Sequence, residues 1–186
     1  MTIDFLLDAF ETYGDAEALV WNDLSYSYED LVKGTKARAE IYAELSGLVV
    51  SLDGDYTFES ITSFLALLHL GCIVVPLAPE SRSQKQELQK IAEVQASIEP
   101  EIVRLGNEVT HPLIKQLLEA NLSGLILFSS GTSGTRKAIV HDASRLLAKY
   151  QKPRRAKRTI PFMLFDHVGG VNTMLHVLSS GGSLVG

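Results

Sequence analysis

The chain has 186 residues, 46% of them hydrophobic and 21% charged, and its formal net charge is −5. This composition is typical of a globular domain and excludes a disordered chain, and the acidic balance gives no global indication of nucleic acid binding. The single cysteine excludes an intramolecular disulfide, and the longest apolar stretch, residues 64–78, is too short and too interrupted to span a bilayer, so we predict a cytoplasmic protein with no membrane span.

Short apolar runs alternate with helical patterns along the chain, which is typical of an α/β layer fold. In the first half the pattern predicts a helix over residues 5–10, a hairpin of strands 18–21 and 24–27, a helix over 28–45, a strand over 47–52, a helix over 58–70 and a strand over 72–75. The continuous apolar run at 47–52 is typical of a parallel strand buried on both faces. We interpret Cys72, which begins a further apolar run, as an inert buried thiol.

The second half continues the alternation. A capping box of Ser83 and Gln86 predicts a helix with Leu88, Ile91, Val94 and Ile98 on one side. The pattern then predicts a strand over 101–104, a helix over 111–120, strands over 125–128 and 138–141, a helix from 143 with Asp142 as its N-cap, a strand over 159–165, a helix over 171–178 and a last strand from 183. The fold class we predict is α/β, with a mainly parallel sheet flanked by helices.

Charge is unevenly distributed along the chain. Residues 1–142 hold 21 acidic and 10 basic residues, a net charge of −11, whereas residues 143–186 hold one acidic and seven basic residues, a net charge of +6. The bases are Arg145, Lys149, Lys152, Arg154, Arg155, Lys157 and Arg158. Such a run is most often a solvated surface, and the alternative is a site for nucleic acid or polyphosphate. Only one aromatic residue, Tyr150, lies among these bases, so we expect no nucleic acid partner.

The segment richest in chemistry is the loop between the predicted strands 125–128 and 138–141. Seven small or hydroxyl-bearing residues, 129–135, precede Arg136 and Lys137. Glycines let such a loop turn sharply, and its successive N–H groups, hydroxyls and cations suit phosphates. The spacing of the glycines excludes a Walker A loop, and Thr135 stands where a hydrolase nucleophile elbow needs glycine. An ordinary flexible Gly/Ser loop remains the alternative at this point.

Residues 128–138 closely resemble the signature loop of the adenylate-forming, AMP-binding superfamily, which includes acyl-CoA synthetases, aryl-CoA ligases, luciferases and the adenylation domains of nonribosomal peptide synthetases. Arg136 and Ala138 depart from the usual proline and glycine, whereas the glycine pair and Lys137 match. Three further segments resemble family motifs in the same order, namely 24–31, 64–77 and 165–182. The resemblance therefore covers the whole chain.

The resemblance implies a parent enzyme that activates a small-molecule carboxylic acid with ATP and Mg²⁺, and then transfers the acyl group to the thiol of CoA or of a carrier protein's phosphopantetheine. It also implies that the loop holds the β- and γ-phosphates through Ser129, Ser130, Gly131, Thr132, Ser133, Gly134, Thr135 and Lys137. His167, with Gly169 and Gly170, would line the acid pocket, although a histidine at a strand end can also be purely structural. No protein metal site is predicted.

The resemblance leaves the acid open. Phe165-Asp166 matches amino-acid-activating members, which place an aspartate there to bind the substrate ammonium, whereas the fourteen-residue step from His167 to Gly181 fits acyl- and aryl-CoA ligases better. We favour a fatty or aryl acid, and hence a role of the fatty acid metabolism type. The alternatives are an amino-acid-activating adenylation domain and a non-catalytic nucleotide-binding module.

The resemblance also bears on domain organisation. We interpret residues 1–186 as the truncated N-terminal part of an AMP-binding domain, without the later motifs and the small C-terminal domain of the family. The main catalytic lysine of the family is expected beyond residue 186, so we expect this chain alone to be inactive.

Overall fold

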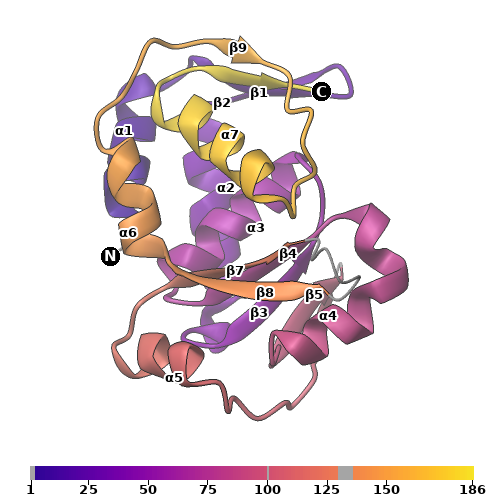
Figure 1. Cartoon of the computed structure of the whole chain (residues 1–186). Coiled ribbons are helices and arrows are strands. Elements are labelled where there is room, and N and C mark those ends of the chain that lie inside the picture. The colour runs from indigo at the N-terminus through magenta and orange to yellow at the C-terminus, as the bar shows by residue number, and fades with distance from the viewer. Residues whose placement is uncertain (1–2, 100, 130–135) are drawn as a thin grey trace.

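The computed structural model describes residues 3–99, 101–129 and 136–186 (Figure 1). The helices are α1 (Asp4–Tyr13), α2 (Tyr28–Ile41), α3 (Phe58–His69), α4 (Lys85–Ile91), α5 (Pro112–Glu119), α6 (Ala143–Leu147) and α7 (Val168–Ser179), with short 3₁₀ turns η1 (Ala43–Leu45), η2 (Pro79–Gln84) and η3 (Ala148–Tyr150). The strands are β1 (Glu17–Trp21), β2 (Leu24–Ser27), β3 (Val49–Asp53), β4 (Ile73–Leu77), β5 (Ala96–Glu99), β6 (Glu101–Arg104), β7 (Gly124–Ser129), β8 (Lys137–Asp142), β9 (Arg158–Thr159) and β10 (Ser183–Val185).

Two sheets organise the part of the chain that the structure describes. The larger has six strands in the order β6-β5-β3-β4-β7-β8, and the smaller has four in the order β2-β1-β10-β9. Helices α2, α3 and α7 lie between the sheets, and α4 and α5 cover the opposite face of the larger one (Figure 1). The four central strands of the larger sheet are parallel, with an antiparallel strand at each edge. The predicted α/β class with a mainly parallel sheet is confirmed.

Strand β3 shows why its sequence is continuously apolar. Val50 and Leu52 point into the core shared with α3, whereas Val49 points into the core under α4 and α5. Because successive side chains of a strand face opposite sides, a strand covered on both sides needs apolar residues at neighbouring positions. The prediction of a strand buried on both faces is confirmed.

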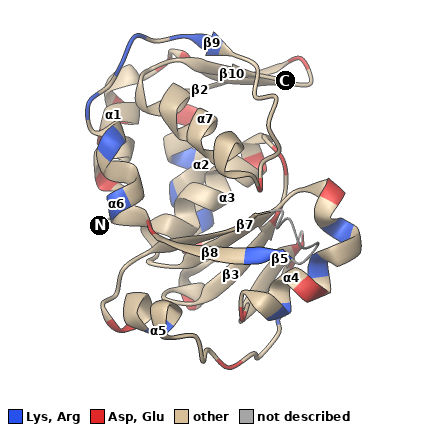
Figure 2. Ribbon diagram, in the orientation of Figure 1, with Lys and Arg blue, Asp and Glu red and all other residues tan. Residues whose placement is uncertain are grey.

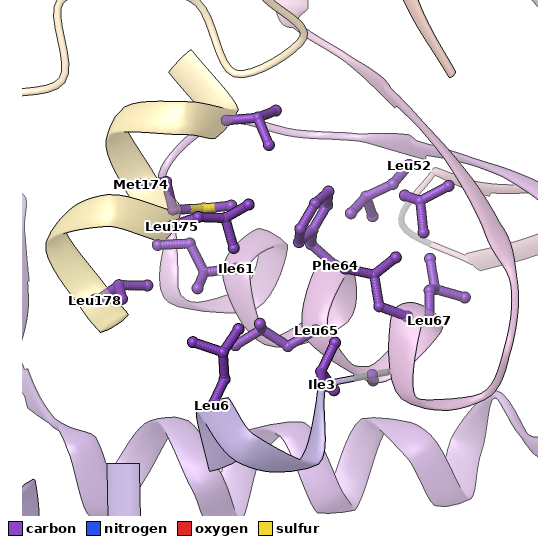
Figure 3. Packing of buried hydrophobic residues seen from close by; sticks show 14 of the residues in the cluster. Ile3, Leu6, Leu52, Ile61, Phe64, Leu65, Leu67, Met174, Leu175 and Leu178 are labelled. Atoms are coloured by element: carbon purple, nitrogen blue, oxygen red, sulfur yellow. The ribbon is translucent and has the colours of Figure 1, made fainter. Parts of the chain in front are cut away.

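The core between the sheets is built around α3. Every side chain from Ser60 to Leu68 is buried, as expected for a helix covered on all sides. Figure 3 shows side chains from α1, α3 and α7 converging there, among them Leu6, Leu65 and Leu175. Cys72 lies in the same cluster, where its Sγ donates to the Leu45 carbonyl at 3.1 Å and burial raises the pKa of the thiol to about 11. The interpretation of Cys72 as a buried, unreactive thiol is supported.

The smaller sheet joins the two ends of the described chain. Strands β1 and β2 form the predicted hairpin, whose turn residues Asn22 and Asp23 have φ values of 50° and 64°, as a type I′ turn requires. Strand β10 pairs in parallel with β1, so that Leu184 lies opposite Leu19. Helix α2 begins on a capping box in which Ser27 and Asp30 satisfy each other's backbone N–H groups.

The helix predicted after Ser83 is wrong in both its start and its end. Ser83 does not cap a helix: residues Pro79–Gln84 form a 3₁₀ turn, and α4 begins at Lys85 without a side-chain cap. Helix α4 also ends at Ile91, and Ile98 belongs to β5. The left-handed φ of Glu93, 53°, ends the helical path, and the alternating residues of β5 happened to continue the helical spacing of apolar residues.

The strand predicted over 159–165 is also wrong, since β9 comprises only Arg158 and Thr159. Pro161 has no N–H to donate to a neighbouring strand, and the chain from 160 to 167 runs without regular structure up to α7. None of the described helices is both long and apolar enough to cross a bilayer.

Candidate functional site

The hairpin of β7 and β8 carries the loop that the sequence analysis singled out. Ser129 ends β7 and pairs with Lys137, the first residue of β8. Four of the six β7 residues are buried, so the hairpin is anchored in the sheet. Ser129 and Lys137 therefore face each other across the base of the loop. The predicted phosphate-binding residues Ser130, Gly131, Thr132, Ser133, Gly134 and Thr135 lie outside the described residues.

His167 lies where the irregular segment 160–167 meets α7. It is the N-cap of that helix, and its ring Nδ1 accepts the N–H of Gly169 at 3.2 Å. Because the side chain accepts at Nδ1, the proton of the neutral ring is placed on Nε2. The ring is exposed. His167 therefore offers a hydrogen-bond donor whose tautomer is set by the helix it caps.

Asp166 ties this segment to the carboxyl end of β4. Its Oδ2 accepts the hydroxyl of Ser81 at 2.6 Å and the N–H of Ala78 at 3.1 Å. Ser81 itself is 3% exposed. A carboxylate that accepts two hydrogen bonds from a neighbouring loop holds that loop and its own segment in one arrangement. The residue before His167 is thus fixed to the larger sheet.

Tyr56 and Gly170 hold the other side of the same segment. The Tyr56 hydroxyl donates to the carbonyl of Met163 at 2.6 Å. A Cβ added at Gly170 would lie 2.0 Å from the Leu164 carbonyl oxygen and 2.3 Å from the Tyr56 hydroxyl, so only glycine fits there. A Cβ added at Gly169, by comparison, would make only ordinary contacts, with its nearest neighbour at 3.4 Å. In this structure the two glycines position the segment of His167 through their backbone.

A cavity of about 170 Å³ brings these separate segments together. Its lining includes Phe128 and Arg136, which flank the loop, together with Asp166 and His167. Glu80, Ser81 and Leu164 complete it. Three parts of the chain far apart in the sequence, namely 80–81, 128 with 136, and 164–167, thus meet at one place, which contains one guanidinium, two carboxylates and a ring N–H donor.

The position of this cavity follows from the sheet. Strands β4 and β7 are parallel neighbours, and both Ser81 and the loop follow their carboxyl ends. Ligands of open α/β sheets bind at this edge. The sequence analysis missed Ser81, Glu80 and Tyr56. The position of residues 80 and 81 a few residues after the predicted strand 72–75 was the available signal for the first two, whereas Tyr56 carried none.

Two cations lie beside the loop, and the cavity lining also includes the carboxylates of Glu80 and Asp166. Arg136 and Lys137 supply two positive charges beside the loop. Among the residues that the structure describes, no group of three or more His, Cys, Asp or Glu side chains could hold a metal ion.

The fold of this chain is also found in solved structures of other proteins. No family model matches the chain. The Klebsiella oxytoca NpsA N-terminal subdomain, solved in complex with 3-hydroxybenzoyl-AMSN, superimposes with a TM-score of 0.76 at 18% identity, over 98% of this chain and 52% of that one. The chain has the fold of an adenylation-domain N-terminal subdomain. The resemblance to the adenylate-forming superfamily is thereby confirmed at the level of the fold.

Two further proteins are similar to this chain, one in fold and one in sequence. NpsA–ThdA, an artificially fused adenylation–PCP di-domain from Klebsiella oxytoca, matches with a TM-score of 0.76 and 18% identity over 99% of this chain and 42% of that one. A hybrid PKS-NRPS synthetase of Neonectria sp. (strain DH2) is 26% identical in an alignment of length 158 that covers 72% of this chain and 4% of that protein. The chain thus spans about half the length of the solved structures and a small part of the synthetase.

Proposed function

We propose that this chain is the N-terminal part of the adenylation domain of an ATP-dependent, acid-activating ligase, and that its loop 129–137 holds the phosphates of ATP. The observation that carries the proposal is the cavity in which Phe128 and Arg136, on either side of the loop, meet Asp166 and His167. A phosphate-binding loop and an acid pocket must adjoin, because the acid carboxylate attacks the α-phosphate. The fold shared with NpsA supports the proposal.

The proposed role of the loop is electrostatic. Lys137 and Arg136 would neutralise charge on the β- and γ-phosphates, and the hydroxyl and N–H groups of residues 129–135 would donate hydrogen bonds to them. As the carboxylate forms its bond to the α-phosphorus and the bond to the bridging oxygen breaks, negative charge develops on the leaving pyrophosphate. Fixed donors and cations stabilise that charge. Mg²⁺ bound with the nucleotide would supply further positive charge for this stabilisation.

The proposed role of His167 is to orient the acid. Its Nε2–H faces outward because Nδ1 accepts from Gly169. A donor beside the cavity can hold one carboxylate oxygen of the acid while the other attacks. The ties of Asp166 to Ser81 and of Tyr56 to Met163 keep this donor in place.

For the acid we favour an aryl or fatty acid, and an amino acid is the alternative. The aryl group in the ligand of the NpsA complex supports the first. The PKS-NRPS relative and the position of Asp166 support the second. For the acceptor, the adenylation–PCP fusion supports a carrier-protein phosphopantetheine over CoA. We place the reaction in the cytoplasm, where the lone thiol of Cys72 would stay reduced.

Calorimetry on residues 1–186 tests the proposal. MgATP and pyrophosphate should each bind, and Lys137→Ala should weaken both by about tenfold or more, since one charge-assisted contact to a phosphate is lost. Lys115→Ala, an exposed lysine of α5 outside the cavity, is the matched control and should bind like the wild type.

One outcome would contradict the proposed role of the loop, and another would favour the alternative function. Equal affinities for wild type and Lys137→Ala would remove the loop from the site. ATP binding without acid-dependent ATP–pyrophosphate exchange in any longer protein that contains residues 1–186 would favour the alternative of a non-catalytic nucleotide-binding module.

A further inference from the structure

A second and larger concavity shares no lining residue with the cavity described above, although Val168 of its lining follows His167 in the chain. It is a groove of about 720 Å³ bounded by α5, the edge strand β8 and α6. Its apolar lining is contributed by Leu113, Leu117, Leu122, Val140 and Leu146. Leu113 is 52% exposed, so part of this apolar surface faces solvent. Partly exposed apolar residues gathered in one groove, and not scattered singly, indicate a binding surface.

Two cations stand at the rim of the groove. Arg145 and Lys149 both line it, together with one carboxylate, that of Asp142. The Arg145 side chain is 90% exposed and reaches Asp142 only at 3.5 Å. Lys149 donates to the side-chain oxygen of Asn172 at 2.7 Å, a neutral partner that leaves its charge uncompensated. The groove therefore combines an apolar floor with a positive rim.

The same cations begin the basic run, which continues beyond the groove. Figure 2 shows basic residues from α6 along the segment that leads to β9. Lys152, Arg154, Arg155 and Lys157 are all exposed, and no carboxylate of the described chain forms an ion pair with them. Their backbone is held in place, since the Arg154 N–H donates to Ser180 at 3.2 Å and the Lys157 carbonyl accepts from Ser183 at 3.0 Å. These charges are displayed from an ordered segment.

We propose that the groove between α5 and α6 binds an acidic amphipathic helix of a partner protein. The apolar face of such a helix would lie on the floor of the groove, and its carboxylates would face Arg145, Lys149 and the start of the basic run. This is the helix-in-groove mode of recognition, with charge complementarity that speeds association and selects the partner. The inference does not depend on the proposed function.

The distribution of charge along the chain favours this occupant over the others. A small amphiphilic anion would contact only the two cations of the rim and leave the rest of the run unused. An extended nucleic acid or an anionic membrane would also approach the remainder of the molecule, where residues 1–142 carry a net charge of −11. A compact acidic helix can contact the positive groove without meeting that repulsion.

The test uses residues 1–186 and a designed helical peptide of about 18 residues, long enough to exceed the groove, with leucines on one face and glutamates beside them. Fluorescence anisotropy measures affinity, and NMR shifts of the ¹⁵N-labelled protein locate the site. We expect binding with shifts confined to α5, β8 and α6. Arg145→Glu/Lys149→Glu should weaken it about tenfold or more, and should gain affinity for the same peptide with lysines in place of its glutamates.

The matched control is Lys90→Glu/Lys115→Glu, which makes the same change in net charge at exposed positions outside the groove lining. Circular dichroism verifies that both double variants fold. The proposal is overturned by the absence of peptide binding, by an equal loss in both double variants, by shifts elsewhere on the molecule, or by tighter binding of a single-stranded oligonucleotide of equal charge.

Discussion

The interior around α3 differs in construction from the rim of the candidate cavity, which here means the contacts among Tyr56, Ser81, Met163 and Asp166. The interior consists of apolar side chains from long continuous patterns, such as Leu65 and Leu67, which are fully buried. The rim consists of polar contacts between segments far apart in the sequence, such as Ser81 with Asp166 and Tyr56 with Met163. The interior stabilises the fold, whereas the rim fixes the positions of a few side chains near the cavity.

This difference predicts which substitutions should mainly lower stability and which should mainly affect the segment that carries His167. Removing an interior side chain leaves a void and lowers the free energy of unfolding, whichever ligand is bound. Removing a rim contact should change stability less and should act chiefly on the segment that carries His167. Three substitutions test the comparison, ordered by expected effect.

Leu65→Ala should have the largest effect, about 2–5 kcal/mol of lost unfolding free energy, because the surrounding helices cannot collapse fully into the void. Denaturant unfolding followed by circular dichroism measures it. Leu113→Ala, at a site 52% exposed, is the control and should change stability by well under half as much. Similar losses at the two sites would show that α3 does not lie in the main core.

Gly170→Ala should cost about 1–3 kcal/mol, because its Cβ meets backbone oxygen and the Tyr56 hydroxyl and cannot be accommodated without moving the segment. The His167 ring signals in NMR spectra should shift at the same time. Gly169→Ala is the matched control, since its Cβ would make ordinary contacts at 3.4 Å and beyond. Equal tolerance of both alanines would contradict the proposed close approach at Gly170.

Ser81→Ala should have the smallest effect on stability, about 1–2 kcal/mol, because Asp166 keeps its bond from the Ala78 N–H. It should nevertheless alter the His167 signals, since one of the two ties of the preceding residue is lost. Ser83→Ala, an exposed serine of the same 3₁₀ turn, is the control. If Ser81→Ala leaves the His167 signals unchanged, the tie does not position that ring.

Sequence reasoning succeeded where contacts are local or periodic. The hairpin at Asn22-Asp23 follows from residues that tolerate positive φ. The helix cap at Asp142 follows from one side chain that accepts from Ser144 and Arg145 nearby. It failed in the segment after η2, where the left-handed Glu93 ends the helical path. It also failed after Thr159, where Pro161 interrupts an apolar pattern that resembles a strand. The division of the strands into two sheets was also beyond it, because β1 and β10 are paired across almost the whole chain.

By itself the sequence determined the α/β class and the buried strands, and it predicted a phosphate-binding loop at 129–137, because apolar periodicity and a run of small residues are properties of neighbouring positions. Only the tertiary structure decided that Arg136, Asp166 and His167 line one cavity, that Ser81 and Tyr56 hold the segment beside it, and that the basic run borders an apolar groove. These meetings depend on strand order and on which helix covers which face. Both are set by packing over the whole chain, so no short stretch of sequence predicts them.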